Sequence, residues 1–432
     1  MRRSRCTRSE RAGRARWTQE RACHVSALDH RRGTASVTLL DAAGRPLADR
    51  EVVVEQLRHA FPFGCIGFDL IDHANGVADE SALADDWLEL FTLAVLPFYW
   101  GGFEPTRGHP DTARLQQSAR WFRERHVRVK GHPLVWHTVK AAWLDALPVD
   151  EVERLVRERV RREVGDFAGL IDEWDAINEV VIMPEFVNEP DGVPNAITKL
   201  AREVGRVDMV RLAVDEARSV VPGIRLLLND FDLSADYERL IERVLDAGVR
   251  LDAIGVQTHM HQGFRGAQLL ELADRFGRFG LPVHFTEASL VSGDLMPASI
   301  VDLNDFQPES WPSTPEGEAR QADELEQHFR MLVGHPAVES VTYWGITDRG
   351  AWLGAPIGLV RADGTRKPSF DRLRALFREE WWHAPTTLRT DATGRLDLSG
   401  FAGDYAITAG DARAEFALPL GSSRPTVQLP GA

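Results

Sequence analysis

The sequence contains few cysteines and no long apolar segment, and both shortages limit what the protein can be. Three cysteines occur in 432 residues, and Cys6, Cys23 and Cys65 show no CxxC spacing. This pattern argues against a disulfide scaffold and against a zinc-ribbon site. No apolar run approaches the roughly 20 residues that a membrane helix requires, so we expect neither an integral membrane protein nor a membrane partner.

Positive charge is scarce beyond the first residues of the chain. The full sequence carries a net charge of −14. Residues 1–32 hold ten arginines against three acidic residues, a balance of +7, so residues 33–432 carry −21. Because phosphate groups bind to basic surfaces, we expect no nucleic-acid partner.

The basic segment 1–32 allows two interpretations. It could be an arm that binds nucleic acid or another surface, but we expect a disordered extension, or an initiation codon assigned too early. The segment has no apolar h-region of the kind that secretory signals contain. As written, the sequence therefore predicts a cytoplasmic protein, and a different true start would change that prediction to a secreted one.

The residues that are present are typical of a large globular protein. Hydrophobic residues make up 44% and charged residues 27% of the chain, which excludes a mostly disordered protein. The length fits one large α/β barrel with an accessory piece, or two to three ordinary domains.

Three zones follow the basic segment. Residues 33–60 contain two β-rich runs around a polar connection, which predicts a β-hairpin. Residues 61–383 alternate short apolar runs with longer amphipathic segments. Residues 384–432 are rich in Thr, Gly, Asp and Ser and predict a small antiparallel β module.

The middle zone contains eight candidate strands separated by helical patterns. Residues 152–167 place apolar side chains on one helical face, and a second helix is predicted from about Ala196 to Val221. Eight strands, each followed by a helix, predict a (β/α)8 TIM barrel, an α/β fold. The rival, a doubly wound open sheet, usually carries a Gly-rich phosphate loop that is missing here. The candidate strands are Phe63–Phe68, Leu93–Phe98, Val127–Gly131, Glu173–Ile177, Arg225–Leu228, Ala253–Gln257, Val283–Thr286 and Val341–Gly345.

Two carboxylates stand out at the predicted strand ends, where a barrel holds its catalytic groups. Glu179 ends the segment WDAINE at the fourth strand, and Glu287 ends FTE at the seventh. A single Glu in such a place is more often a helix N-terminal residue or an ion-pair partner. Glycoside hydrolysis, however, needs two carboxyl groups across the scissile bond, so the pair favours that chemistry.

The strand-end motifs resemble those of glycoside hydrolase family 10, the endo-1,4-β-xylanase family with a (β/α)8 barrel. WDAINE is similar to the WDxxNE segment of that family, and FTE to its TE motif. GHPLVWH, IGVQTH and WGITDRGAW are similar to three further motifs, and the resemblance spans roughly residues 61–380. It implies a retaining hydrolase that degrades xylan or a related β-linked plant polysaccharide and needs no cofactor and no metal.

The resemblance also implies a role for each matched residue. Glu287 is then the nucleophile and Glu179 the acid/base of a double displacement, with the two carboxyl groups about 5–5.5 Å apart. Of the two carboxyl groups, that of Glu179 must have the higher pKa, which predicts apolar or negatively charged surroundings for it. The implied substrate-binding residues are His132, Trp136, Asn178 at the sugar 2-hydroxyl, Gln257 near the acid/base, His259 near the nucleophile, and Trp344 and Trp352 as an apolar floor.

Two segments depart from the family. An ENxMKW-like segment normally follows the second strand, where its Asn and Lys contact the sugar, but Pro97, Phe98, Tyr99 and Trp100 stand there instead. The nucleophile motif changes from TELD-like to TEAS, so that Ser289 replaces an expected Asp. The first change should alter which hydroxyl patterns are accepted, and the second should alter the surroundings of Glu287.

Purely structural roles remain open for several residues and segments. We expect Trp143 and Trp174 to be packing residues, and we leave Asn229 and Asp230 outside the catalytic set because both can simply close a strand end. The C-terminal β module could bind carbohydrate or act as a structural cap. The 33–60 hairpin could complete one face of the barrel or belong to a small β domain.

Two other functions compete with the glycosidase. His259 and His261, together with His132 and His137, could form part of a metal-dependent hydrolase. The barrel metal hydrolases place such an HxH pair after the first strand rather than the sixth, which disfavours this reading. A non-catalytic carbohydrate-binding barrel is the other alternative, prompted by the altered segment 97–100 and opposed by the two intact glutamates.

Overall fold

The computed structural model describes residues 28–189 and 192–431, which form two compact units. The larger unit comprises residues 62–332 and 337–374, and the smaller comprises the described residues up to 61, residues 333–336 and those from 375 onward. The predicted disordered extension lies mostly outside the described residues. No described helix is long and apolar enough to cross a membrane.

The larger unit is a closed barrel of eight parallel strands, which confirms the predicted fold. Each strand pairs with the next along the chain, and β11 closes the ring by pairing with both β10 and β3. The two-residue strand β9 (His259–Met260) adds to β10 beyond the ring. The barrel strands are β3 (Phe63–Ile66), β4 (Leu93–Pro97), β5 (Arg128–His132), β6 (Glu173–Asn178), β7 (Arg225–Asp230), β8 (Ala253–Val256), β10 (Val283–Leu290) and β11 (Val338–Tyr343).

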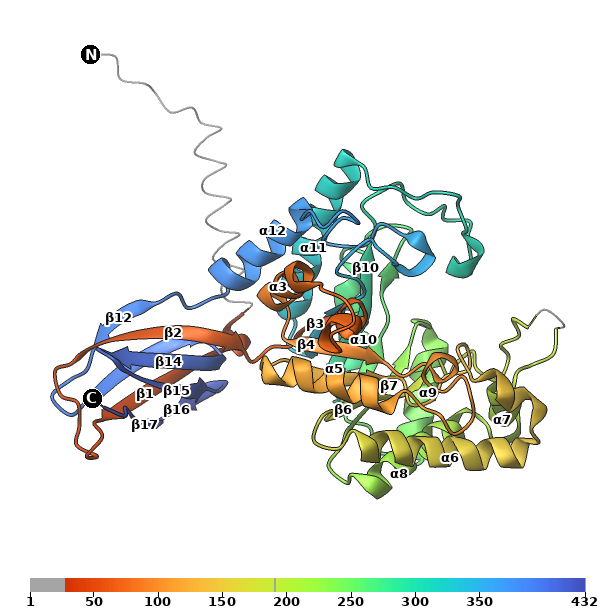
Figure 1. The fold of residues 1–432 in the computed structure, drawn as a ribbon, viewed down its shortest axis with the longest axis horizontal. Helices are drawn as coiled ribbons and strands as arrows, with labels where there is room; N and C mark the ends of the chain where they lie inside the picture. Colours follow the sequence, from red (N-terminus) through yellow and green to blue (C-terminus); the bar gives the residue numbers. More distant parts are fainter. Residues whose placement is uncertain (1–27, 190–191, 432) are drawn as a thin grey trace, which may run out of the picture. The chain divides into compact units, whose positions relative to one another are not determined.

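The barrel strands are buried on both faces because helices cover their outer side (Figure 1). Every residue of β6, β8 and β10 is buried, as expected for parallel strands inside a ring of helices. The helix predicted for residues 196–221 is interrupted at Gly205, which adopts a φ of +84° that favours glycine. The helices of eight or more residues are α3 (Ser81–Leu90), α5 (Thr112–Glu124), α6 (Val149–Asp166), α7 (Ala196–Val204), α8 (Arg206–Val220), α9 (Ala235–Asp246), α10 (Gln268–Gly277), α11 (Pro315–Val333) and α12 (Pro368–Ala375).

Short helical segments lie in the loops at the strand ends and at the edges of both units. The α-helical ones are α2 (Ile71–Ala74) and α4 (Trp100–Phe103). The others are η1 (Asp29–Arg31), η2 (Phe68–Leu70), η3 (Ala142–Ala146), η4 (Leu303–Asp305), η5 (Trp352–Gly354) and the π-helical η6 (Leu376–Glu380).

The smaller unit is a β-sandwich built from both ends of the described chain. One sheet has the order β13-β1-β16, with β17 also paired to β1, and the other has the order β12-β2-β14-β15. The strands are β1 (Arg32–Leu40), β2 (Glu51–His59), β12 (Thr386–Arg389), β13 (Arg395–Phe401), β14 (Gly403–Ala409), β15 (Ala412–Leu418), β16 (Gly421–Ser423) and β17 (Thr426–Gln428).

The hairpin predicted for residues 33–60 is not formed. β1 and β2 lie in different sheets, and each pairs with strands from the C-terminal segment. Both strands alternate buried and exposed residues, so each has one apolar face, and these faces meet across the sandwich instead of lying side by side. The separate hairpin and C-terminal module of the prediction are therefore parts of one unit.

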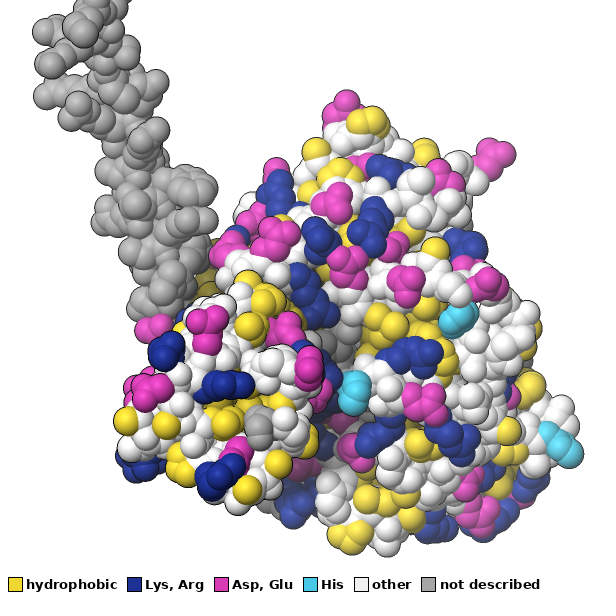
Figure 2. Space-filling view, turned by 60° about the vertical axis from the view of Figure 1, so that its left-hand side comes forward, with side chains coloured by type: hydrophobic (Ala, Val, Ile, Leu, Met, Phe, Trp, Pro, Cys, Tyr) yellow, Lys and Arg dark blue, Asp and Glu magenta, His cyan; other side chains and the backbone are white. Residues whose placement is uncertain are grey.

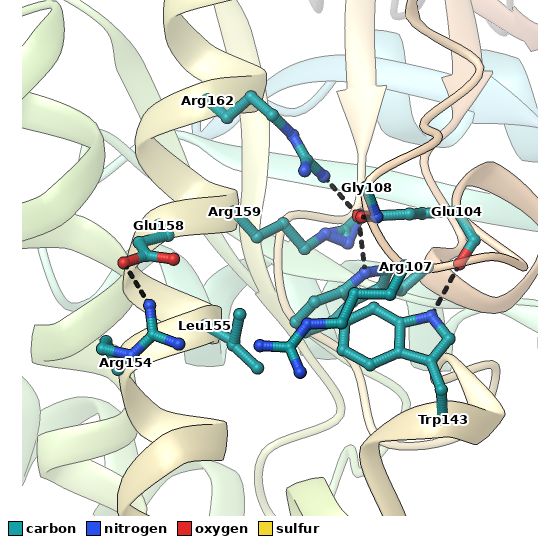
Figure 3. Close-up of a pocket in the computed structure, with 10 residues that line it drawn as sticks. Glu104, Arg107, Gly108, Trp143, Arg154, Leu155, Glu158, Arg159 and Arg162 are labelled. Carbon is teal, nitrogen blue, oxygen red and sulfur yellow. Dashed lines mark hydrogen bonds and ion pairs between the residues drawn. The ribbon is translucent and has the colours of Figure 1, made fainter.

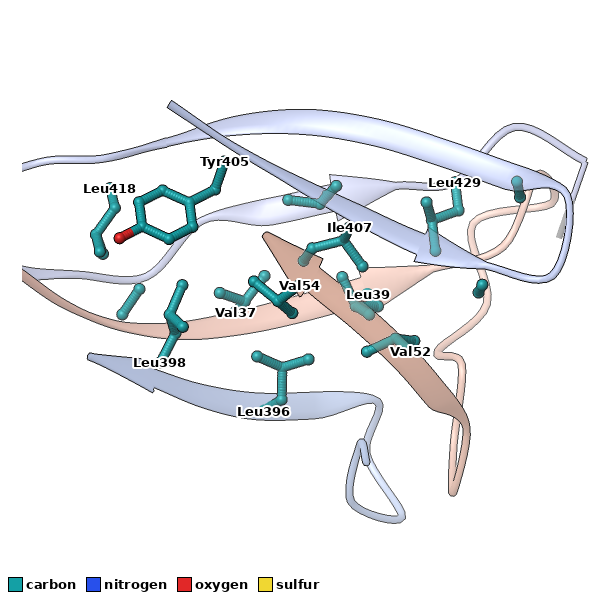
Figure 4. Packing of buried hydrophobic residues seen from close by; sticks show 14 residues of the cluster. Val37, Leu39, Val52, Val54, Leu396, Leu398, Tyr405, Ile407, Leu418 and Leu429 are labelled. Carbon is teal, nitrogen blue, oxygen red and sulfur yellow. The ribbon is translucent and has the colours of Figure 1, made fainter. Parts of the chain in front are cut away.

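The core of this unit draws apolar side chains from both sheets (Figure 4). Val37 and Leu398 come from one sheet, and Val54 and Ile407 come from the other. All four are at most 4% exposed. Shared burial of this kind is the main force that holds two sheets face to face.

Candidate active site

Glu179 directly follows β6, and Glu287 lies in the carboxyl-terminal half of β10, on the edge of the barrel where the strand-end motifs meet. Glu179 adopts a φ of +56°, which is strained for a residue other than glycine. Two hydrogen bonds hold this turn against β7. The Glu179 amide donates to the Asn229 carbonyl at 2.8 Å, and the Val181 amide donates to Asp230 Oδ2 at 3.0 Å.

Burial and neighbouring carboxylates outweigh two donors at Glu179. Trp136 Nε1 donates to its Oε2 at 2.7 Å and Gln257 Nε2 lies 3.4 Å from its Oε1, and both contacts favour the ionised form. Burial raises the pKa of Glu179 to about 8, with a further contribution from the negative charge of Glu287. Asp230 stands behind it, and burial raises the pKa of this second carboxyl to about 7. The expected apolar and negatively charged surroundings of Glu179 are therefore present.

Glu287 is surrounded by hydrogen-bond donors. Asn229 Nδ2 donates to its Oε1 at 2.8 Å, and His259 Nε2 lies 3.2 Å from its Oε2. His132 Nε2 lies 4.0 Å from Oε1 on the side of β5. Only 5% of Glu287 is exposed, so these contacts act in surroundings with little water. Such contacts stabilise a carboxylate in its ionised form.

A chain of three side-chain amides connects the two glutamates. Gln257 Nε2 donates to Asn178 Oδ1 at 3.0 Å as well as lying near Glu179. Asn229 Nδ2 donates to the same Asn178 oxygen at 2.8 Å and to Glu287. Thr286 Oγ1 donates to Asn229 Oδ1 at 2.6 Å and so fixes the orientation of that amide. Asn229, which we left out of the catalytic set, is thus central to the site.

The side-chain amide of Asn178 has a hydrogen-bond donor without a partner in the described chain. Its Oδ1 accepts two hydrogen bonds, whereas its Nδ2 is buried and has no hydrogen-bond partner in the described chain. An unpaired buried donor of this kind is costly unless a ligand satisfies it. The geometry therefore suits the predicted contact of Asn178 with a sugar hydroxyl.

His132 is held in place by a buried ion pair beneath it. Its Nδ1 lies 2.8 Å from Asp175 Oδ2, while Lys130 Nζ lies 2.7 Å from Asp175 Oδ1. Burial would raise the pKa of Asp175, but the Lys130 charge and the His132 contact outweigh it and lower that pKa. Because Asp175 is ionised, it favours a proton on the near nitrogen of the His132 ring. The other nitrogen then points to the side of Glu287.

Aromatic rings line the site around the two glutamates. Trp344 is 8% exposed, and its ring lies 5.2 Å from His132 and 6.2 Å from His259. Trp352 is 36% exposed, and its ring lies 5.0 Å from His259. The Tyr99 ring lies 5.4 Å from Trp136. The predicted apolar floor therefore has one buried and one accessible tryptophan.

The altered segment 97–100 contributes one side chain to this wall. Phe98 is fully buried and packs against Trp174, so it cannot reach a sugar, and Trp100 Nε1 donates to Glu104 at 3.1 Å. Tyr99 is half-buried. Burial and then the charges of Glu287 and Glu179 raise its pKa well above its usual range, so its phenol keeps its proton. Among Phe98, Tyr99 and Trp100, Tyr99 is therefore the residue that faces the two glutamates.

A second hollow lies on the other side of this segment (Figure 3). The pocket has a volume of about 250 Å³ and lies between the loop after β4 and helix α6. Its charges are paired, since Arg162 donates to Glu104 at 2.5 Å and Arg154 donates to Glu158 at 2.5 Å. Arg159 donates to the Phe98 carbonyl and stacks on Trp100 at 4.8 Å. These contacts fasten the loop that carries Tyr99 to α6, and the Trp143 indole, which donates to the Glu104 carbonyl at 3.0 Å, belongs to the same packing.

The four histidines that could form part of a metal-dependent hydrolase contact different partners. His259 faces Glu287, and His132 faces Asp175. His261 Nε2 lies 3.2 Å from Ser289 Oγ, and His137 packs against Phe186 at 4.3 Å. Within residues 28–189 and 192–431, no group of three or more His, Cys, Asp or Glu side chains is placed to hold a metal ion.

The chain matches known proteins over most of its length. The family model "Glycosyl hydrolase family 10" matches residues 94–375. The anti-sigma-I factor RsgI6 of Acetivibrio thermocellus is 24% identical over 412 residues, which are 92% of this chain and 48% of that protein. A β-1,4-xylanase of Dictyoglomus thermophilum is 27% identical over 52% of this chain and 62% of its own length. The chain thus spans less than two thirds of these curated relatives.

Solved structures share the fold. A GH10 structure from Paenibacillus barcinonensis has a TM-score of 0.59 at 21% identity and covers 74% of this chain and 95% of its own. Xylanase 10B of Thermotoga petrophila RKU-1, solved in complex with xylobiose, has a TM-score of 0.60 at 19% identity, with 74% and 94% covered. The family model covers well over half of the sequence and includes both glutamates, so the chain belongs to glycosyl hydrolase family 10.

Proposed function

We propose that the protein is a retaining glycoside hydrolase that cleaves β-1,4-linked xylan or a related plant polysaccharide. The observation that carries the proposal is the pair Glu179 and Glu287. The Glu179 carboxyl has a pKa raised to about 8, and the Glu287 carboxylate accepts a hydrogen bond from Asn229 at 2.8 Å. A glycosidase needs one carboxyl that gives a proton and a second that attacks as a carboxylate, and the two glutamates suit these two roles.

The first half of the reaction forms a covalent intermediate. Glu287 attacks the anomeric carbon while Glu179 gives its proton to the departing glycosidic oxygen. Asn229 fixes the orientation of the Glu287 carboxylate, and Trp136 fixes that of Glu179. The free Nδ2 of Asn178 donates to the sugar 2-hydroxyl, a hydrogen bond that strengthens in the transition state.

The second half releases the sugar. After the leaving group departs, Glu179 is ionised and takes a proton from water, and the resulting hydroxide attacks the anomeric carbon and displaces Glu287. Glu287 loses its negative charge when the ester forms, which removes one of the causes of the high pKa of Glu179. The same residue can therefore act as acid in the first step and as base in the second.

Xylan is the first substrate to test because two kinds of relatives point to it. The curated relatives include proteins named endo-1,4-β-xylanase, and one similar structure contains xylobiose. Tyr99 offers an uncharged donor where the family resemblance implies a lysine. We therefore expect this enzyme to discriminate among sugars with different hydroxyl patterns in a different way from its relatives.

A second candidate function is carbohydrate binding without turnover. RsgI6, which matches 92% of this chain, is named as an anti-sigma factor rather than as an enzyme. The altered segment 97–100 favours this candidate as well, because Phe98 is buried and only Tyr99 faces the site.

For the β unit we favour a structural role over a binding role. Sugar-binding sheets present exposed aromatic rings for stacking. In the described part of this unit, every Trp, Tyr and Phe side chain is buried or half-buried.

Reducing-sugar release from soluble xylan tests the proposal, with the wild type run beside Glu287→Ala. We expect release by the wild type and none by the variant. Activity that survives the substitution would show that Glu287 is not the nucleophile. If neither protein releases sugar, isothermal titration with xylo-oligosaccharides separates the candidates, because binding without turnover supports the second and absence of both excludes xylan.

A further inference from the structure

His259, which contacts Glu287, is backed by Ser289, the residue that stands where TELD-like sequences have an Asp. Its Nε2 faces Glu287 Oε2 at 3.2 Å, and its Nδ1 lies 3.1 Å from Ser289 Oγ. The same hydroxyl lies 3.2 Å from His261 Nε2. His259 and Ser289 are paired across β9 and β10, and Ser289 and His261 are fully buried. Four side chains thus form one continuous hydrogen-bonded line that ends on the nucleophile.

The direction of each hydrogen bond in this line follows from the number of protons available. An ionised carboxylate only accepts, so His259 must carry a proton on Nε2. Ser289 has a single hydroxyl proton and can give it to one of the two rings. Burial lowers the pKa of His261 to about 3, so that ring is neutral and has one proton.

Two proton arrangements give the Ser289 hydroxyl proton an acceptor, whereas a third, in which both rings donate to Ser289 Oγ, leaves that buried proton without one of these acceptors and is disfavoured. In the first, His261 Nε2 donates to Ser289, Ser289 donates to Nδ1 of a neutral His259, and only a lone pair at His261 Nδ1 is unpaired. In the second, a charged His259 donates to Ser289, which donates to His261, and the proton of His261 lies on Nδ1. That atom is buried and has no hydrogen-bond partner in the described chain. The second arrangement therefore leaves an N–H unpaired in the interior, which costs more than an unpaired lone pair.

We propose that Ser289 and His261 are positioning residues that hold His259 uncharged while its Nε2–H donates to Glu287. The inference rests on the proposed function of Glu287 as the nucleophile. Glu287 is the one charged group among the described contacts of His259. The remaining contacts are the Ser289 hydroxyl and the rings of His261, Trp344 and Trp352. No carboxylate stands at Nδ1, where TELD-like sequences would place an Asp.

An uncharged His259 suits a nucleophile whose charge disappears during the reaction. Glu287 is negative before attack and neutral once it forms an ester with the sugar. A charged imidazole beside it would then be left without its counter-ion in a nearly closed site, which is unfavourable. A neutral donor keeps its hydrogen bond through both states.

Nitrogen NMR of the full-length protein labelled with ¹⁵N-histidine tests the proposal without requiring turnover. The signals of His259 and His261 are assigned from His259→Gln and His261→Gln. We expect His259 at pH 7 to show one protonated and one bare ring nitrogen, with the proton on Nε2. A doubly protonated His259 in the wild type at pH 7 would overturn the proposal, and this result would be valid even if xylan proved to be the wrong substrate.

Two substitutions of Ser289 add an activity readout. Ser289→Asp places a carboxylate at Nδ1, so we expect a doubly protonated His259 and an acid limb of kcat/KM shifted by about one pH unit to lower pH. Ser289→Ala removes one hydrogen bond and should lower kcat/KM about tenfold. Ser340→Ala, which removes a buried hydroxyl bound to the Pro62 carbonyl at 3.3 Å, is the matched control and should change neither readout. An unshifted acid limb in a folded Ser289→Asp would contradict the proposal.

Discussion

Glu179 and Glu287 have the same side chain, yet the strands around them give each a different set of partners. Glu179 sits beside a second buried carboxyl, Asp230, and has one close donor, Trp136. Glu287 has a close amide donor from β7 and an imidazole from β9, and a second imidazole from β5 lies 4.0 Å away. The number of donors and the nearest charge thus distinguish the two glutamates, as the proposed roles of acid and nucleophile require.

The departures from the family motifs are also distributed unequally around the two glutamates. The donors of Glu287 include one from β9, whose support by Ser289 departs from the family pattern. Trp136 and Gln257 beside Glu179 stand in segments similar to the family motifs. The two departures from the motifs therefore lie behind Glu287, at Ser289, and in the segment that carries Tyr99.

The largest effect should come from removing the nucleophile. Glu287→Ala should lower kcat on xylan by more than about 10⁴-fold, because no other carboxylate can form the ester. Added azide should restore part of the activity and give an inverted glycosyl azide, which product NMR would detect. Glu309→Ala, an exposed Glu in a loop, is the matched control. A retained configuration in the rescued product would indicate a different nucleophile.

Removing the proton donor should cost less and should depend on the leaving group. Glu179→Gln should lower kcat about 10²- to 10⁴-fold on xylan and far less on an aryl xyloside whose phenol leaves without protonation. In the wild type, activity should fall as the pH rises through about 8, because the acid form of Glu179 is lost there. An equal loss on both substrates, or an alkaline limb that persists in the variant, would show that another group donates the proton.

Cutting the amide chain between the two glutamates should have an intermediate effect. Asn229→Ala removes the donor to Glu287 and one of two donors to Asn178, and the resulting misplacement should lower kcat/KM about 10²-fold. Asn75→Ala, which removes an amide bound to the Ile71 carbonyl at 2.8 Å, serves as the control. Should Asn229→Ala act no more strongly than Asn75→Ala, the bridge has no catalytic importance.

The smallest effect concerns stability and has a definite sign. The pKa of Glu179 is raised above its unfolded value of about 4.5, so the folded protein binds more protons than the unfolded chain between pH 4.5 and 8. Stability contributed by this residue is therefore complete at low pH and decreases as the pH rises through this window. Glu179→Gln replaces the ionisable carboxyl by a neutral amide, so the pH-dependent cost of burying it disappears. The free energy of unfolding should therefore rise by roughly 1–2 kcal/mol at pH 7. Urea unfolding at pH 7 and pH 4 measures the difference, which should vanish at pH 4.

The barrel and its two glutamates could be predicted because their signals are local. Most barrel strands contain a short apolar run, and Glu179 directly follows β6 while Glu287 lies within β10, next to the run Val283–Thr286. Asn229 gave no such signal, because it lies on β7 and reaches Glu287 only where the strands meet at one edge of a closed ring. The contact of Ser289 with His259 likewise depends on the pairing of β9 with β10.

The strand pairing in the β unit is a second feature that the sequence does not predict. The alternation in β1 and β2 predicts strands but does not say which strands they pair with. Their partners come from the other end of the chain, after the whole barrel. The predicted hairpin, in which β1 pairs with β2, is therefore wrong.

The pairing of β1 with β13 also sets an order in time. Arg32 lies opposite Phe401, so the first strand of the β unit leaves the ribosome long before its partner exists. At about 5–20 residues per second, the delay is roughly 20–70 s. During that interval the apolar faces of β1 and β2 have no sheet to cover them, whereas each barrel strand meets its next neighbour soon after it emerges. We therefore expect the β unit to fold last, and a nascent chain to depend on chaperones mainly through its first two strands.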